Sequence, residues 1–268
     1  MKNIFWATFH FSLILYSVLS VSCRKSAEDE FNDANLNSKA KFLTRLEVVS
    51  TRYEENLVID ISYDSNNRVT SFAVNSAENG LSYYSLYYDS NNSLNGAIRD
   101  GDFLDVDDLY QSPLNVFETG TVLEYDEKGN PSRIEINKYN YDLIYGGVFD
   151  SFDYLTGEIT YENAPNPFFH TLNAAKFIDV LDMVNLNLGF QASPSIVKAR
   201  QLLPLNNIKK MNFWNPEEDF HVEVNANYDY DTDNYPKEAI IITKYTDYTE
   251  SNIPVLGSTR QITYTYKQ

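Results

Sequence analysis

Residues 220–231 read FHVEVNANYDYD, and apolar or aromatic side chains alternate with polar ones through the whole stretch. Successive side chains of a β-strand point to opposite faces, so this stretch predicts a strand with one apolar face and one wet face. Residues 233–236 (DNYP) interrupt the alternation, and 239–248 resume it with three consecutive isoleucines. The pattern therefore predicts a β-hairpin over 220–248.

The same alternation recurs along the chain, and four strand ends carry a Tyr-Asp pair followed by a short turn. The pairs are Tyr63-Asp64, Tyr88-Asp89, Tyr125-Asp126 and Tyr230-Asp231. Asn and Gly in these turns suit backbone positions with positive φ, and Asp can accept bonds from the backbone two residues on. The spacings of 25, 37 and 105 residues disfavour a strict solenoid or propeller. Convergent hairpin chemistry, in which Tyr favours strands and Asp favours turns, is the alternative to a true repeat.

One segment departs from the alternation. Phe177, Val180, Leu181, Val184 and Leu188 follow helical spacing, which predicts a helix over about 172–188. We therefore expect a single all-β antiparallel domain over 41–268, either a barrel or a strongly curved meander sheet of about ten or more strands, with one inserted helix. A lipid-spanning barrel is the rival, disfavoured because the wet faces carry charge.

The composition excludes several classes of protein. The chain has 268 residues, with 21 Lys and Arg against 38 Asp and Glu and a net charge of −17, so we expect no nucleic-acid partner. Hydrophobic residues at 43% and aromatic residues at 15% are too frequent for a disordered chain. One Cys and three His argue against a disulfide framework and a Cys- or His-rich metal site, and we expect no metal and no cofactor.

The N-terminus is typical of an exported lipoprotein. Residues 1–22 carry one charge, Lys2, and a short apolar run, and they end at Cys23, the only Cys in the chain. We expect 1–22 to be a lipoprotein signal peptide, Cys23 to be the lipidated residue that anchors the protein in the membrane, and 23–40 to be a flexible polar tether. An ordinary secretory signal with an incidental Cys is the alternative.

Together these features resemble the Bacteroidota lipoproteins that carry a Tyr-Asp-repeat domain of unknown function. The residues that carry the resemblance are Cys23, the Tyr63-Asp64 and Tyr125-Asp126 turns, residues 159–167, and the run from Tyr228 to Lys237. The resemblance covers about 41–268 and implies a porin-like antiparallel β fold and an outer-membrane anchor, on the periplasmic or the surface side. The family has no assigned catalytic residues, so the resemblance implies none here.

The candidate ligand-facing residues are the aromatics Tyr83, Tyr84, Tyr87 and Tyr88, which fall on both faces of one predicted strand. Exposed aromatics flanked by Asn and Asp suit a glycan or protein partner, whereas burial of both faces is the alternative. The acidic residues near 100–108 and at 229–233 match no complete calcium loop. The sequence favours a non-enzymatic cell-envelope lipoprotein that acts as a binding module. The alternatives are a structural or assembly component and, less favoured, a hydrolase with a carboxylate pair.

Overall fold

The computed structural model describes residues 26–36, 38–52, 55–105, 120–137, 154–178, 185–186, 197–198, 203–215, 220–247 and 255–268. Thirteen strands form one sheet in the order β6-β5-β4-β3-β2-β1-β15-β14-β13-β12-β9-β8-β7, and each pairing in it is antiparallel. The strands are β1 (Leu43–Ser50), β2 (Leu57–Tyr63), β3 (Val69–Ser76), β4 (Gly80–Tyr88), β5 (Leu94–Arg99), β6 (Asp102–Asp105), β7 (Gly120–Tyr125), β8 (Pro131–Asn137), β9 (Tyr154–Pro165), β12 (Asn206–Asn215), β13 (Phe220–Tyr230), β14 (Pro236–Asp247) and β15 (Val255–Tyr266). The predicted all-β antiparallel fold is confirmed.

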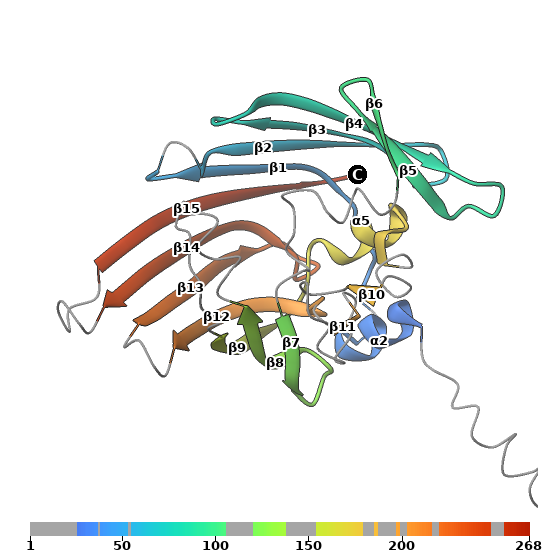
Figure 1. The fold of residues 1–268 in the computed structure, drawn as a ribbon. Coiled ribbons are helices and arrows are strands. Elements are labelled where there is room, and N and C mark those ends of the chain that lie inside the picture. The colour runs from blue at the N-terminus through green and yellow to red at the C-terminus, as the bar shows by residue number, and fades with distance from the viewer. Residues whose placement is uncertain are drawn as a thin grey trace, which may run out of the picture.

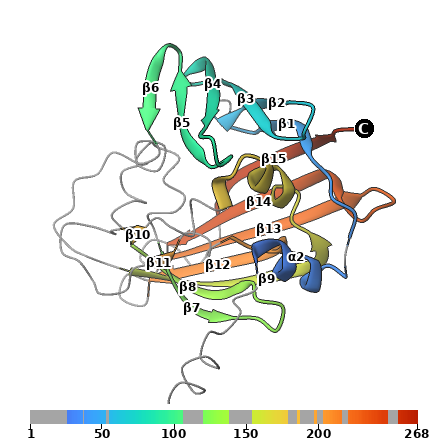
Figure 2. The same cartoon turned by 90° about the vertical axis from the view of Figure 1, so that its right-hand side faces the viewer.

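The sheet is strongly curved rather than closed. Figures 1 and 2 show it wrapping around a central space, with β1 to β6 as one wall and β7 to β9 with β12 as the other. β6 and β7 lie at the two ends of the strand order, and no pairing joins them within the residues that the structure describes. Of the two architectures left open by the sequence, the structure is therefore the curved meander sheet. The first strand, β1, pairs with the last, β15, in the middle of this sheet.

The hairpin predicted over 220–248 is present as β13 and β14, which pair from Phe220 with Asp247 to Tyr230 with Pro236. The apolar side chains at the even positions of β13 face the interior, since Val222 and Ala226 are buried. Cross-strand neighbours on the inner face of β1, β14 and β15 form a core cluster of Leu43, Leu46, Ala239 and Tyr264.

The predicted inserted helix exists but has different bounds. α5 spans Phe169–Ala174, three residues earlier than expected. The regular helix does not continue through Lys176, because the φ of this residue is 62° and the left-handed region does not occur inside an α-helix. Residues 185–186 form β10 (Asn185–Leu186), which pairs with β11 (Val197–Lys198), and 179–184 lie outside the described residues. The prediction of helix was wrong at residues 185–186, because cross-strand pairing replaces the helix there.

The expected flexible tether over 23–40 is wrong for residues 27–34. Residues 27–34 form a helix, α2 (Ala27–Ala34), and Phe31 within it is completely buried. Phe31 and Ala34 pack with Phe169, Ile178 and Leu205 in a core cluster of their own. Phe31, the one large apolar residue of α2, therefore holds this helix on the domain. Figures 1 and 2 show α2 and α5 together at one end of the curved sheet.

Candidate functional site

The four candidate tyrosines divide between the two faces of β4. Tyr83 and Tyr87 are 56% and 44% exposed, and they share the outer face with Leu81 at 53%. Tyr84 and Tyr88 point to the opposite, inner face. The structure therefore brings two of the four residues to solvent, and the sequence analysis missed Leu81, which the two-residue period places on the same face as Tyr83. We name Leu81, Tyr83 and Tyr87 the outer strip.

Each tyrosine of the outer strip has a small residue directly opposite it on one neighbouring strand. Tyr83 pairs with Ala73 of β3, and Tyr87 pairs with Gly96 of β5. Ser85, between the two tyrosines, pairs with Ser71 and Ile98. Directly opposite residues in a sheet lie about 5 Å apart, so the tyrosine rings have few bulky neighbours on their own face. The strip is a shallow surface with aromatic rings rather than a deep pocket.

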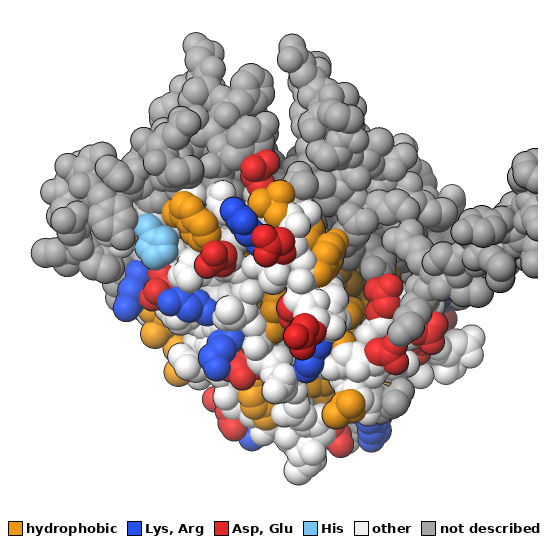
Figure 3. Space-filling model, turned by 90° about the horizontal axis from the view of Figure 1, so that it is seen from below, with side chains coloured by type: hydrophobic (Ala, Val, Ile, Leu, Met, Phe, Trp, Pro, Cys, Tyr) orange, Lys and Arg blue, Asp and Glu red, His pale blue; other side chains and the backbone are white. Residues whose placement is uncertain are grey.

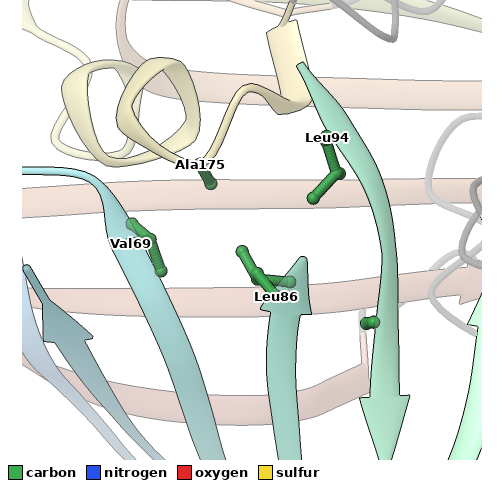
Figure 4. Packing of buried hydrophobic residues seen from close by; sticks show 5 residues of the cluster. Val69, Leu86, Leu94 and Ala175 are labelled. Carbon is green, nitrogen blue, oxygen red and sulfur yellow. The ribbon is translucent and has the colours of Figure 1, made fainter. Parts of the chain in front are cut away.

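The inner side of β4 is fixed by packing. Val69, Leu86, Leu94, Ala97 and Ala175 form a buried cluster, to which the residue directly after α5, Ala175, belongs (Figure 4). The Tyr88 hydroxyl donates to the carbonyl oxygen of Val69 at 2.6 Å.

The inner rings are also paired with cations. The Arg68 guanidinium lies 4.5 Å from the centroid of the Tyr88 ring, and the Arg99 guanidinium lies 5.6 Å from that of Tyr84.

Asp100 fixes the backbone of Tyr83. The Tyr83 N–H donates to Asp100 Oδ1 at 2.9 Å, and the Asp100 N–H donates to the Tyr83 carbonyl oxygen at 3.1 Å. Asp100 itself has a φ of 50°, a conformation that Asp tolerates better than most residues. Asp100, one of the acidic residues near 100–108, thus positions one member of the outer strip.

The four Tyr-Asp turns have one geometry. In each, the Asp Oδ1 accepts from the N–H groups two and four residues on, and the Asp N–H donates to the carbonyl four residues on. The residue three places after the Asp has positive φ in every case: Asn67, Asn92, Gly129 and Asn234. The shared geometry means that the repeat is a repeated turn structure, which we call the Asp turn.

Electrostatics reinforce two of the Asp turns. Backbone N–H groups of Arg68 and Asn66, together with the Arg68 side chain, lower the pKa of the Asp64 carboxyl. Burial opposes ionisation of Asp231, but the Lys41 ammonium at 2.6 Å and two backbone N–H groups outweigh it and lower its pKa. Lys41 also contacts Asp233 at 2.7 Å. The carboxylates of Asp64 and Asp231 therefore stabilise their turns and have a structural role.

Tyrosine hydroxyls tie the strands together at the end of the sheet that carries the Asp turns. Five of them donate to a main-chain carbonyl 19 to 30 residues earlier, at 2.6 to 2.8 Å: Tyr63, Tyr88, Tyr161, Tyr228 and Tyr266. Burial raises the pKa of Tyr63 and of Tyr88 to about 12, and it raises the pKa values of the other three as well. These tyrosines are neutral donors at physiological pH and serve the fold.

The outer face of the other wall is mixed in character. Figure 3 shows acidic and basic side chains interleaved there with polar and hydrophobic ones. Lys210 and Glu223 form an ion pair at 2.7 Å across β12 and β13, and Arg133 and Glu124 form one at 3.3 Å across β8 and β7. The outer strip therefore differs in character from this part of the surface.

The remaining chemical candidates do not assemble into a site. His170 is buried among Phe31, Phe42 and Phe169, and burial lowers its pKa to about 4. Within the described ranges, no three His, Cys, Asp or Glu side chains lie close enough together to hold a metal ion. The helices that the structure describes are all too short or too polar to cross a membrane. Cys23 and residues 1–22 lie outside the described residues, as do Asp107 and Asp108.

Comparison with solved structures gives porin-like neighbours, among them two Bacteroides proteins. No family model and no curated protein sequence matches the chain. A porin-like protein from Bacteroides uniformis superimposes with a TM-score of 0.35 at 8% identity, covering 84% of this chain and 98% of its own. A porin-like protein from Bacteroides vulgatus superimposes with a TM-score of 0.37 at 11% identity, covering 85% of this chain and 99% of its own. The chain is thus similar to these porin-like proteins over most of its length.

Proposed function

We propose that the protein is a non-enzymatic cell-envelope lipoprotein, anchored in the outer membrane through Cys23, which binds a glycan with the outer strip of β4. The observation that carries the proposal is the exposure of Tyr83 and Tyr87 on one face, above a strand that is fixed from below. A rigid aromatic surface loses little conformational entropy when it binds.

The size of the outer strip favours a chain-like ligand over a folded protein partner. Aromatic side chains bury about 150–250 Å² each, so two half-exposed tyrosines and Leu81 offer about 300 Å². A stable protein interface needs about 800 Å² on each partner. Tyr83 and Tyr87 are four residues apart along β4, which places them about 14 Å from each other. That separation suits two rings of one oligosaccharide.

The charge of the chain selects among glycans. A net charge of −17 repels acidic polymers, which disfavours anionic polysaccharides for the same reason as nucleic acids. The C–H groups of a neutral sugar ring carry partial positive charge and are attracted to the negative face of an aromatic ring. A neutral glycan is therefore compatible both with the aromatic surface of the outer strip and with the negative charge of the protein.

The test is a screen of neutral oligosaccharides against the full-length protein in detergent, followed by calorimetric titration of each hit. We expect Tyr83→Ala and Tyr87→Ala each to weaken binding about tenfold, which corresponds to about 1.4 kcal/mol. Tyr125→Ala is the matched control, since Tyr125 is 46% exposed but lies on β7, on the opposite wall of the sheet. Its binding constant should equal that of the unmodified protein.

The same screen, run together with a screen of candidate protein partners, separates the alternatives. Silence toward every glycan would reject the glycan-binding role and favour a structural or assembly component. Tight binding of a defined protein partner that survives both tyrosine substitutions would place the binding function elsewhere. Release of shortened sugars during the titration would contradict the non-enzymatic assignment and point to a carboxylate pair.

A further inference from the structure

The helix closest to the proposed lipid anchor is part of the folded domain. The Phe31 ring of α2 stacks on the Phe169 ring of α5, with centroids 4.1 Å apart and planes 16° apart. Phe31 and Phe169 are both completely buried, and Leu205 packs against them. α2 is therefore held on the domain by an aromatic core contact.

Both ends of α2 are fixed as well. At its start, Ser26 and Asp29 form a reciprocal capping box, with the Asp29 N–H donating to Ser26 Oγ at 3.1 Å. At its end, Asn35 donates to the carbonyls of Phe31 and Leu205 at 3.0 Å each. Asn35 Oδ1 in turn accepts from Asn206 Nδ2 at 2.7 Å. α2 is thus capped at its start and bonded to the domain at its end.

The capped start of α2 limits how far the domain can stand from a membrane. Only Arg24 and Lys25 separate Cys23 from Ser26. A chain spans at most about 3.6 Å per residue, so the Cα of Ser26 lies within about 11 Å of that of Cys23. If the chain were free up to Leu43, the same limit would be about 70 Å.

We propose that the domain stands directly on the lipid surface, with the end of the sheet that carries the Asp turns facing the bilayer. This inference rests on the proposed acylation of Cys23. α2 lies at that end, because Asn206 links Asn35 to Asn130 of the third Asp turn (Figure 1). We expect this end of the sheet to contact the lipid headgroups. Because α2 is packed on the domain, it holds the domain close to the acylated Cys23.

The proposal also orients the binding surface. β13 spans 11 residues, which at about 3.4 Å each separates the two ends of the sheet by about 37 Å. The turn between β3 and β4, at 77–79, lies at the far end (Figure 1). Leu81 and Tyr83 follow that turn, whereas Tyr87 lies two residues before Asp89 of the second Asp turn, so the outer strip runs from the far end toward the end that faces lipid. A ligand therefore reaches Leu81 and Tyr83 from the side that faces away from the bilayer.

Fluorescence energy transfer in vesicles tests the orientation. Donor dyes are placed at Glu127→Cys, in the third Asp turn, or at Glu78→Cys, in the far turn; both positions are exposed. The chain has one natural Cys, which acylation blocks, so the dye reacts only at the engineered site. The acceptor is a headgroup-labelled lipid in neutral phosphatidylcholine vesicles. We expect strong quenching of the donor at 127 and weak quenching of the donor at 78.

A flexible insertion between Lys25 and Ser26 supplies the matched variant, since it leaves the capping box and the core unchanged. About ten Gly and Ser residues add about 17 Å of mean reach, so quenching at 127 should fall toward the value at 78. Phe31→Ala, which frees α2, should have the same effect. Equal quenching at the two sites of an acylated, uninserted protein would overturn the orientation. Acylation is measured separately by mass spectrometry; an unmodified Cys23 would instead overturn the anchor of the proposed function.

Discussion

Asn130 offers the sharpest test of how the fold is held, because one completely buried side chain uses all its hydrogen-bonding groups. Its Oδ1 accepts from the N–H groups of Leu205 at 2.7 Å and Asn206 at 3.0 Å. Its Nδ2 donates to Asp126 Oδ2 and to Asn206 Oδ1, both at 3.0 Å. Asn130→Ala removes these four bonds and leaves buried polar groups of the neighbouring segment unpaired.

The expected cost follows from those contacts. A neutral hydrogen bond contributes about 1 kcal/mol net, and a buried donor left unpaired costs about 1–3 kcal/mol. Allowing for relaxation of the two backbone donors, we expect Asn130→Ala to lower the free energy of unfolding by about 4 kcal/mol. Chemical denaturation followed by the fluorescence of Trp214, which lies in β12 with Asn206, measures it.

Ser93→Ala is the matched control, since Ser93 occupies the same place in the second Asp turn. Its N–H and carbonyl make the same bonds to Asp89, but its side chain is exposed. We expect a change within about 0.5 kcal/mol. If the two substitutions cost the same, the buried asparagine contacts contribute nothing beyond the turn itself and the reasoning fails.

Three further predictions concern burial. Burial lowers the pKa of His170 to about 4, whereas the same side chain in the unfolded chain protonates near pH 6.5. The free energy of unfolding is therefore highest above pH 6.5 and falls by up to about 3 kcal/mol as the pH drops toward 4. Acid denaturation curves of His170→Phe should lack this pH dependence. Tyr63 and Tyr88, with pKa values raised to about 12, stabilise the fold fully below pH 10, and absorbance and circular dichroism should show unfolding as pH rises from 10 to 12. Gly157→Ala places a Cβ 2.5 Å from the Phe213 ring and should cost about 1–3 kcal/mol in thermal unfolding, whereas a neutral result would mean that the ring can move.

The sequence predicted the sheet well because alternation is a direct consequence of strand geometry. The 220–248 hairpin matches the pattern almost residue for residue. The faces of β4 could not be assigned in the same way. Odd positions carry Leu81, Tyr83 and Tyr87, and even positions carry Tyr84, Leu86 and Tyr88, so the two faces are equally apolar. The choice is made by distant residues that pack under Leu86, which no local pattern contains.

The missed helix α2 has a different cause. An eight-residue helix with one large apolar side chain has too little periodicity to be distinguished from a polar linker. The local signal was the Ser26-to-Asp29 capping spacing, followed by Phe31 and Ala34 three residues apart. That signal is common in linkers too. What decides the outcome is the partner, Phe169, 138 residues later in the chain.

The irregular spacing of the Tyr-Asp pairs is explained by how the Asp turn works. Each turn closes within five residues, because one carboxylate binds N–H groups two and four positions on and one residue with positive φ completes the reversal. Nothing in that geometry fixes the length of the strands or of the segments between turns. A solenoid needs a constant period, since each unit stacks on the last. A curved antiparallel sheet needs only that its strands end at the same level. The tyrosine–carbonyl bonds at that end of the sheet hold the strand ends together. The repeat therefore constrains one end of the sheet and leaves the strands free to carry different surfaces, of which the outer strip is one.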